Sequence, residues 1–227
     1  MSWISSALAG DLIIDPTTTV TNSSDVRLMD GGFYGSGGSL SIAKNTGVSK
    51  SRSLVSFNVS TIPASATVLN AQMKLYYYSG VGSTWGDRWV QAHQVYESWA
   101  KSQANRDNRR TGVAWKVQYG KIGGGADSTT TDANGTMEST MLFQNGQIYT
   151  WKNWDLTALT QQWVSNTVPN LGVMLWVAPV GATNEDTDYN TLWFRSSEYS
   201  NSTYWPKLEV TYSTIRQRRR FIFSKII

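Results

Sequence analysis

The feature that most constrains the fold is a long alternating segment, residues 68–78. Apolar or aromatic residues recur there at every second position: Leu69, Ala71, Met73, Leu75 and Tyr77. A period of two is that of a β-strand, because successive side chains point to opposite faces of a sheet. The segment therefore predicts one long strand with an apolar face toward a core.

Shorter segments of the same kind surround this strand and are separated by Gly- and Ser-rich turns, such as residues 35–38. The other expected strands are 25–29, 39–43, 51–59, 88–96 and 171–177, with further strand signals up to residue 212. In the strand at 52–58, Leu54 and Ser56 face one way, and Val55 and Phe57 face the other.

One helix is expected. Asp155 is its N-cap candidate, and Leu156, Leu159 and Trp163 fall on one helical face. We therefore predict an all-β fold, a jelly-roll-like sandwich of two antiparallel sheets with one short helix.

The length of 227 residues fits one large β-domain. We divide the chain into an N-terminal arm (1–14), a β-sandwich (15–213) and a docking tail (214–227). Residues 100–146 have weak strand signals, and long loops of this size are usually functional or mobile. There is no cysteine, which excludes a disulfide framework and a thiolate metal site.

The chain is expected to be extracellular, on a virion or a cell surface. It has no apolar run near the ~20 residues that span a membrane. Residues 1–10 lack the basic region and the apolar core of a signal peptide. Either a signal was removed and Met1 added, or the chain leaves its cell by another route, such as incorporation into a virus particle.

The basic charge lies at the C-terminal end. Removing the five positive charges of residues 216–227 from the net +4 leaves −1 for the rest of the chain. The expected assembly contacts are Arg216, Arg218, Arg219, Arg220, Phe221, Phe223 and Ile226. Apolar residues after a basic run are an aggregation hazard if left free. We expect the tail to dock as an added strand or a plug against a neighbouring subunit, the same or a different protein, and not on nucleic acid.

The order of several short motifs resembles a known family. They include Trp154-Asp155-Leu156-Thr157, Phe194-Arg195-Ser196-Ser197-Glu198 and Pro206-Lys207-Leu208-Glu209. Together with the Gly-rich turn at 35–38 and Glu97-Ser98-Trp99, this order resembles the DNRLRE domain family over most of residues 15–212. The resemblance implies an extracellular β-sandwich related to carbohydrate-binding modules and without catalytic activity.

Catalysis and cofactors are not expected from the residues. His93 is the only histidine and lies in a strand, where a structural role is favoured over that of a general base. Seven carboxylates are candidates for a glycosidase pair, and their spacing selects none: Asp87, Glu97, Glu138, Glu185, Asp186, Asp188 and Glu198. The segment 185–188 has oxygens that suit calcium but not the spacing of a calcium loop, so a solvated turn is favoured.

Ligand contacts are expected from aromatic residues in turns: Trp85, Tyr189, Tyr199 and Tyr204. Such rings stack on sugars or anchor a protein. The tryptophans within the motifs are assigned to the core: Trp99, Trp115, Trp154, Trp163 and Trp193. Arg195 and Glu198 either contact a ligand or form an internal ion pair, and the ion pair is favoured.

Two hypotheses of function follow. The first is a non-catalytic structural protein of an extracellular assembly, a virion-surface or capsid-decorating protein docked through its tail. The second is a carbohydrate-binding module of a secreted or cell-surface bacterial or archaeal protein, with polysaccharide as its partner.

Overall fold

A computed structural model describes residues 9–14, 24–29, 36–44, 50–82, 88–118, 120, 131–144, 147–179 and 190–214. The elements are β1 (Ala9–Ile14), β2 (Ser24–Met29), β3 (Ser39–Lys44), β4 (Ser51–Ser56), β5 (Thr67–Gly82), β6 (Arg88–Gln94), β7 (Asn108–Arg110), β8 (Val113–Ala114), β9 (Ser139–Phe143), β10 (Thr150–Asp155), α1 (Thr157–Val164), β11 (Val173–Pro179), β12 (Asn190–Arg195), the 3-10 helix η1 (Ser202–Tyr204) and β13 (Lys207–Ser213).

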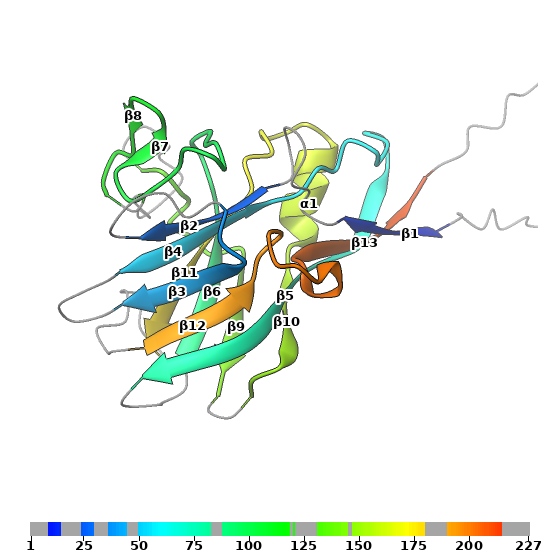
Figure 1. The fold of residues 1–227 in the computed structure, drawn as a ribbon. Coiled ribbons are helices and arrows are strands. Elements are labelled where there is room, and N and C mark those ends of the chain that lie inside the picture. The colour runs from blue at the N-terminus through cyan, green and yellow to red at the C-terminus, as the bar shows by residue number, and fades with distance from the viewer. Residues whose placement is uncertain are drawn as a thin grey trace, which may run out of the picture.

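Antiparallel pairing joins eleven of these strands into one sheet, with the order β1-β13-β5-β12-β3-β4-β11-β6-β9. β10 pairs with β5, β2 pairs with β4, and the hairpin β7-β8 stands apart. The sheet curls so that β9, at one end of the strand order, comes close to β10: the backbone N–H of Asp155 in β10 donates to Ser139 Oγ at the start of β9, 3.1 Å away. The result is a nearly closed barrel (Figure 1).

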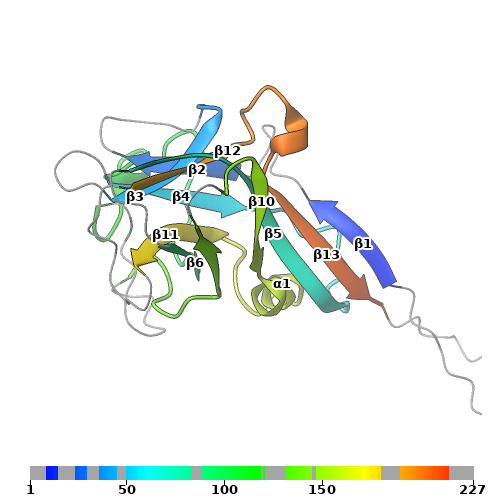
Figure 2. The same cartoon turned by 90° about the horizontal axis from the view of Figure 1, so that it is seen from below.

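The prediction of a mostly β, antiparallel fold with one helix is confirmed for the described residues. The pairing does not divide the strands into two sandwich sheets, since one continuous series of strand pairs connects all eleven strands. Figure 2 shows β2, β3 and β12 on one side, and β6, β11 and α1 on the other.

The core fills the inside of the barrel and is centred on four aromatic rings. Tyr77, Phe143, Trp154 and Phe194 are almost completely buried. Their ring centroids lie 5.1 to 6.2 Å apart, within the range of favourable edge-to-face contact. The Trp154 indole donates to the carbonyl oxygen of Val90 at 2.8 Å, which ties β10 to β6 across the closing seam.

The predicted alternation in β4 is confirmed, and both of its faces are buried. Val55 and Phe57 belong to the main core. Leu54 faces a second cluster, built with Val26, Trp115 and other residues under the loops that follow β6.

The predicted alternation in β5 holds for four of its five apolar positions. Ala71, Met73, Leu75 and Tyr77 are buried, whereas Leu69 is 54% exposed. The cause is a β-bulge: Thr211 pairs with Asn70 and Tyr212 with Val68, so Leu69 is an extra residue in β5. The bulge reverses the parity of the strand and brings Val68 inward instead.

The helix α1 follows the predicted pattern. Leu156, Leu159 and Trp163 are buried. Asp155 accepts hydrogen bonds from the Thr157 backbone at 2.9 Å and its hydroxyl at 2.6 Å, although Leu156 is the residue at the N-cap position. The carboxylate therefore fixes the first turn from one position earlier than expected.

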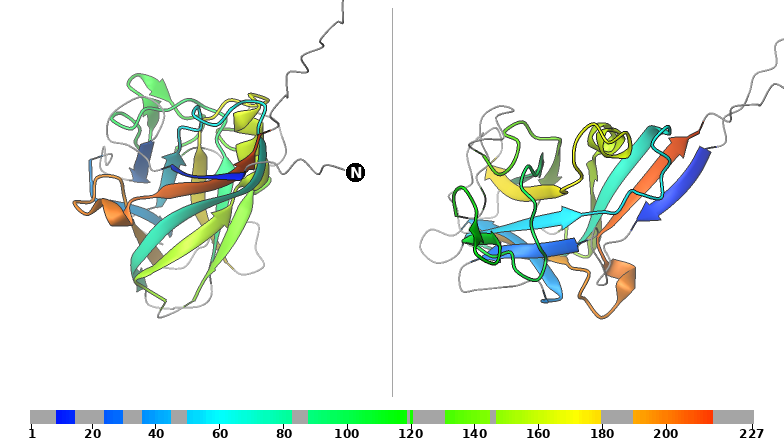
Figure 3. Two further views of the ribbon diagram at one scale, coloured as in Figure 1. Left: turned by 90° about the vertical axis from the view of Figure 1, so that its right-hand side faces the viewer. Right: turned by 90° about the horizontal axis from the view of Figure 1, so that it is seen from above.

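Residues 9–14, predicted as part of the N-terminal arm, form β1 and pair in register with β13, from Ala9 opposite Ser213 to Ile14 opposite Leu208. β1, β13 and the first half of β5 extend as a ribbon beyond the barrel (Figure 3). No helix in the described ranges is long and apolar enough to cross a membrane.

Candidate functional site

The outward face of β5 carries a continuous aromatic surface, which we name the aromatic platform. It consists of Tyr76, Tyr78, Tyr149, Trp151, Tyr199 and Tyr204, together with Arg195 and Lys207. Most of these side chains are half-buried, so they are held by neighbours while part of each surface remains open to solvent.

Three of the rings form the centre of the platform. Tyr76 in β5 and Trp151 in β10 are direct cross-strand partners, and their ring centroids lie 5.5 Å apart. The ring of Tyr204 in η1 packs on Tyr76, with the centroids 4.3 Å apart, and the Tyr199 ring centroid lies 6.2 Å from that of Tyr204. Register fixes the first pair, and the short 3-10 helix, seen in orange in Figure 2, brings in the third ring.

Two hydrogen bonds between side chains and the backbone hold the turn that carries Tyr199 and Tyr204. The Asn201 side chain accepts from the Thr203 backbone at 3.0 Å and caps η1. The Trp205 indole donates to the Tyr199 carbonyl at 2.6 Å. The two rings are therefore positioned before any ligand arrives.

Arg195 lies between two tyrosines. Its guanidinium carbon is 3.7 Å from the centroid of the Tyr78 ring and 3.9 Å from that of Tyr199. Among the described residues no carboxylate forms an ion pair with it. A planar cation held between two rings keeps its N–H groups available at the edges of the stack.

A second β-bulge places Tyr78 in this stack. Trp193 pairs with Ser79 and Phe194 with Tyr77, so Tyr78 is the extra residue of β5 at this point. Its hydroxyl lies 2.8 Å from Ser39 Oγ on β3, which fixes the ring beside Arg195. Bulges commonly re-aim side chains next to functional sites.

The opposite end of the platform is also cationic. Lys207 Nζ lies 4.4 Å from the centroid of the Trp151 ring and 3.7 Å from a Glu209 carboxylate oxygen. Glu209 pairs with Lys74 as well. Two lysines share one carboxylate, so the group formed by these three described side chains carries a net positive charge.

Tyr149 adds the most open ring. It is 67% exposed and has φ = +59°, an uncommon conformation for a residue with a side chain. Desolvation is the largest cause of the raised pKa of the Tyr76 hydroxyl, followed by Tyr204; Tyr149 and Tyr199 add to the effect, and Arg195 opposes it. Backbone strain of this kind is concentrated at functional sites.

Of the four predicted ligand contacts, two lie in the platform and two lie outside the described residues. Tyr199 and Tyr204 lie in the platform. Trp85 and Tyr189 lie outside the described residues, as do the calcium candidate segment 185–188 and all the assembly contacts of the tail: Arg216, Arg218, Arg219, Arg220, Phe221, Phe223 and Ile226.

Five residues of the platform were not predicted from the sequence: Tyr76, Tyr78, Tyr149, Trp151 and Lys207. A signal was present, because the solvent side of the alternating strand holds Lys74, Tyr76 and Tyr78 rather than the short polar residues usual there. An aromatic outer face on a strand with a complete apolar inner face indicates a surface that contacts something.

The predicted ion pair between Arg195 and Glu198 is wrong. Glu198 forms its ion pair with Lys101, whose amino group also donates to Ser197 Oγ at 2.9 Å. Arg195 stacks on tyrosines instead, because β12 points it outward and Glu198 lies in the turn beyond the strand. The assignment of Trp193 to the core also fails, since its half-buried ring lies on the outer face under Arg27, 5.1 Å from the guanidinium carbon.

A buried carboxylate anchors this same turn. Asp25 in β2 is 1% exposed and accepts a 2.8 Å hydrogen bond from the Ser197 backbone. Desolvation raises its pKa to about 6, against the opposing effects of Lys101 and Ser197. The carboxylate holds the end of β12, and with it the turn that carries Tyr199, against β2.

His93 has the geometry of a structural residue. It is 1% exposed, with its ring nitrogens 2.8 Å from the Asn134 carbonyl oxygen and 3.1 Å from Gln91 Oε1. Burial lowers its pKa to about 4, with Arg52 adding to the decrease and the Asn134 hydrogen bond opposing it. Within the described ranges no group of three His, Asp or Glu side chains is arranged to hold a metal ion.

Comparison with known families identifies the domain. The model described as "Disaggregatase related repeat domain" matches residues 33–210, which include every strand from β3 to β12 and all the described platform residues. The chain belongs to this family. No curated protein matches the chain.

The resemblance to the DNRLRE family is therefore wrong, because the matching family is a different one. The motifs that suggested it contribute mainly core and strand residues: Trp154, Leu156, Phe194 and Leu208 are all buried. Such residues are selected by packing in any antiparallel β-domain, so they indicate a fold class more than a family.

Proposed function

We propose that this disaggregatase related repeat domain is a non-catalytic carbohydrate-binding module and that the aromatic platform is its binding surface. The observation that carries the proposal is the unbroken chain of ring contacts from Trp151 through Tyr76 and Tyr204 to Tyr199, on the outer face of a rigid sheet. Aromatic rings away from the core need another reason to be gathered and held in place.

The chemistry of the platform suits a sugar chain. Tyrosine and tryptophan offer flat apolar faces together with a polar edge, which complement the C–H faces and the hydroxyls of sugar rings. Arg195 and Lys207 stand at separate points of the platform and supply donors to hydroxyl or acidic groups. A surface built in this way follows a chain over several residues and does not enclose one small molecule.

The family description supports an accessory role. A repeat is a unit that occurs in copies, and a binding module gains avidity from copies without new contacts. We also propose that the domain has no catalytic activity and that it acts outside the cell, on a cell surface or in a secreted protein.

Assembly is the second candidate function, and β1 is the observation that favours it. β1 lies at the end of the strand order and pairs with β13 alone among the described strands. An open strand edge is a template for pairing with another subunit. A virion-surface or capsid-decorating role would use this edge together with the tail, and the partner would be a neighbouring subunit, the same protein or another.

As a finer description of the fold, we propose that the two curved halves of the barrel act as the layers of a jelly-roll-like sandwich. The support is the position of β2, β3 and β12 opposite β6 and β11 in Figure 2. A strand-by-strand hydrogen-exchange map would test this proposal, because two layers predict faster exchange at the β4-β11 pairing, which joins them through three residue pairs, than at the pairings between β6 and β11 or between β3 and β12.

The binding proposal is tested with a panel of neutral and acidic polysaccharides, by affinity electrophoresis and calorimetry. Trp151→Ala, Tyr204→Ala and Arg195→Ala should each weaken binding about tenfold or more, which corresponds to ~1.4 kcal/mol. Tyr204→Phe should retain most of the affinity because it keeps the ring.

Met137→Ala is the matched control, because Met137 is 46% exposed and is not part of the platform. The proposal fails if no polysaccharide binds the wild-type chain, or if the platform variants bind as well as Met137→Ala. The assembly candidate is measured separately, by light scattering of the full chain and of a chain that ends at Ser213. A particle or oligomer formed by the full chain alone supports it, and two identical monomers contradict tail-dependent assembly.

A further inference from the structure

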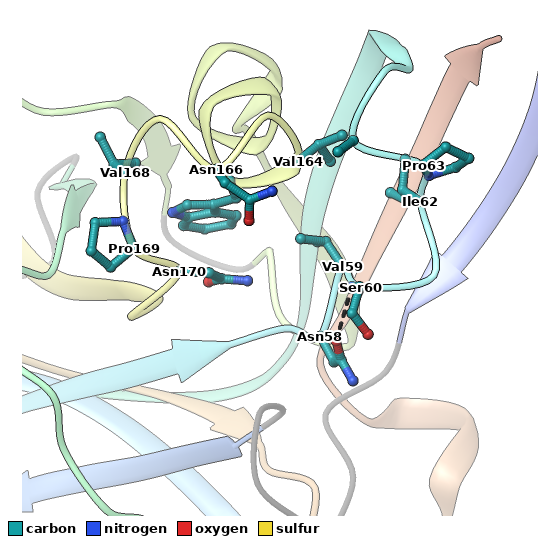
Figure 4. A pocket seen from close by; sticks show the side chains of 12 residues that line it. Asn58, Val59, Ser60, Ile62, Pro63, Val164, Asn166, Val168, Pro169 and Asn170 are labelled. Atoms are coloured by element: carbon teal, nitrogen blue, oxygen red, sulfur yellow. Dashed lines mark hydrogen bonds between the residues drawn. The ribbon is translucent and has the colours of Figure 1, made fainter.

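A cavity of about 680 Å³ lies between the end of α1 and the connection from β4 to β5. Figure 4 shows the segment from Asn166 to Asn170 on one side and Asn58 to Pro63 on the other. Its volume is within the range typical of small-molecule sites. It is separate from the platform, since α1 and η1 lie on opposite sides of the molecule in Figure 2.

The residues that line the cavity are all uncharged. Among these described residues, Asn58, Asn166 and Asn170 contribute side-chain amides and Ser60 contributes a hydroxyl, while Val59 and Pro169 are apolar. A lining without charge, with amide and hydroxyl groups, favours a neutral ligand with many hydrogen-bonding groups.

Two buried polar atoms in this lining lack partners among the described residues. Trp163 is 3% exposed, and its indole N–H makes no hydrogen bond. Asn170 donates through its amide nitrogen to the Phe57 carbonyl at 2.7 Å, but its Oδ1 accepts from nothing. An unsatisfied buried group is costly, and a hydroxyl that reaches these two residues, from a ligand or a buried water, supplies both the acceptor and the donor that they lack.

The C-terminal cap of α1 sets the position of Asn166. Its backbone N–H bonds to the Trp163 carbonyl at 3.2 Å, the Thr167 N–H bonds to the Gln162 carbonyl at 2.9 Å, and Asn166 has φ = +57°. This is the Schellman pattern, in which glycine is the usual residue at the left-handed position. Replacing Asn166 by glycine therefore removes its amide from the cavity without a steric reason for the fold to change.

We propose that this cavity is a second binding site of the domain and that it takes a neutral sugar ring. Hydroxyls both donate and accept, so one ring meets the Asn170 oxygen and the Trp163 N–H after a small opening of the lining. The C–H face of the ring then lies on Val59 and Pro169, and Asn166 bonds to its outer hydroxyls. The inference does not depend on the aromatic platform.

The test is a titration of the full chain followed by the indole N–H resonances of its eleven tryptophans. Neutral hexoses and their short oligomers are added, with a neutral peptide of similar size as the competing class. The Trp163 resonance should shift saturably with a sugar and not with the peptide. Asn166→Gly should weaken this response roughly three- to tenfold, the loss expected for one hydrogen bond.

Trp151→Ala separates this proposal from the previous one. It should leave the Trp163 response unchanged, even if polysaccharide binding at the platform is lost or was never present. The proposal is overturned if no sugar shifts the Trp163 resonance, if the peptide shifts it equally, or if Asn166→Gly binds with full affinity.

Discussion

The two faces of β5 carry aromatic residues for different reasons. On the inner face, Tyr77 is 1% exposed and packs against Phe143 and Phe194 inside the nearly closed barrel. On the outer face, Tyr76 is half-buried, and its neighbours are Trp151 and Tyr204. The inner contacts remove apolar surface from water and stabilise the fold, whereas the outer contacts arrange surface that stays open. The same residue type therefore serves stability on one side and recognition on the other.

The largest loss of stability should come from removing a buried aromatic side chain on the inner side of the barrel. Trp154→Ala removes a fully buried ring and its 2.8 Å hydrogen bond to Val90, and should cost about 3–5 kcal/mol in the free energy of unfolding. Trp151→Ala, three residues earlier on the outer face, should cost about 1 kcal/mol. Urea titration followed by far-ultraviolet circular dichroism measures both, and equal losses would refute the division between the faces.

Titratable groups sharpen the comparison, because two of them are buried and respond to pH in opposite ways. Asp25 has its pKa raised from 3.8 to about 6, so between these values the native state holds a proton that the unfolded chain releases, and stability falls as pH rises. His93 has its pKa lowered from 6.5 to about 4, so the unfolded chain binds the extra proton, and stability falls as pH falls through that window.

The two trends offset each other in the wild type, each on the order of 3 kcal/mol over its window. For Asp25→Asn, the free energy of unfolding relative to wild type should rise as pH increases from 4 to 6. For His93→Gln, it should fall as pH increases over the same range. Chemical denaturation at several pH values measures this difference. Parallel profiles for the two variants and the wild type would show that neither group titrates with a shifted pKa.

Arginine chemistry tests the outer face directly. Arg195→Lys keeps the charge but loses the planar group that stacks between Tyr78 and Tyr199, so polysaccharide binding should weaken about fivefold with little change in stability. Calorimetry on the best ligand of the panel measures the loss. A lysine variant with wild-type affinity would mean that only the charge of Arg195 matters. Lys101→Arg, in the partly buried ion pair with Glu198, is the control, because it exchanges the same two residue types outside the platform and should leave binding unchanged.

The smallest change in stability is expected from removing one tyrosine hydroxyl on each face of β5. The Tyr77 hydroxyl is buried without a hydrogen-bond partner among the described residues, and burial raises its pKa to about 12. Tyr77→Phe should therefore raise the free energy of unfolding by about 1 kcal/mol. Tyr76→Phe should leave stability within ~0.5 kcal/mol. If Tyr77→Phe were destabilising, its hydroxyl would have a partner, such as a buried water.

Prediction from sequence was most reliable where period and packing agree. The alternation in β4 and β5 and the apolar face of α1 correctly indicated that Val55, Met73 and Leu159 belong to the core. It was least reliable at Trp193 and Arg195. The apolar ring of Trp193 suggested the core, and the charge of Arg195 suggested an ion pair. The orientation of β12 places both side chains on the outer face of the barrel. Family assignment from motifs failed for a related reason, since the motifs were made of core residues that many β-domains share.

The sequence by itself determined the antiparallel β-class, the apolar inner face of β5 and the single helix, because these depend on the side-chain period along one segment. The tertiary structure alone decided that the sheet nearly closes, that Leu69 turns outward and that Tyr78 meets Arg195. Each of these depends on a register or a bulge between strands far apart in the sequence, as with Leu69, which is extra only relative to Thr211 and Tyr212. A local pattern contains no information on which residue a distant strand will leave unpaired.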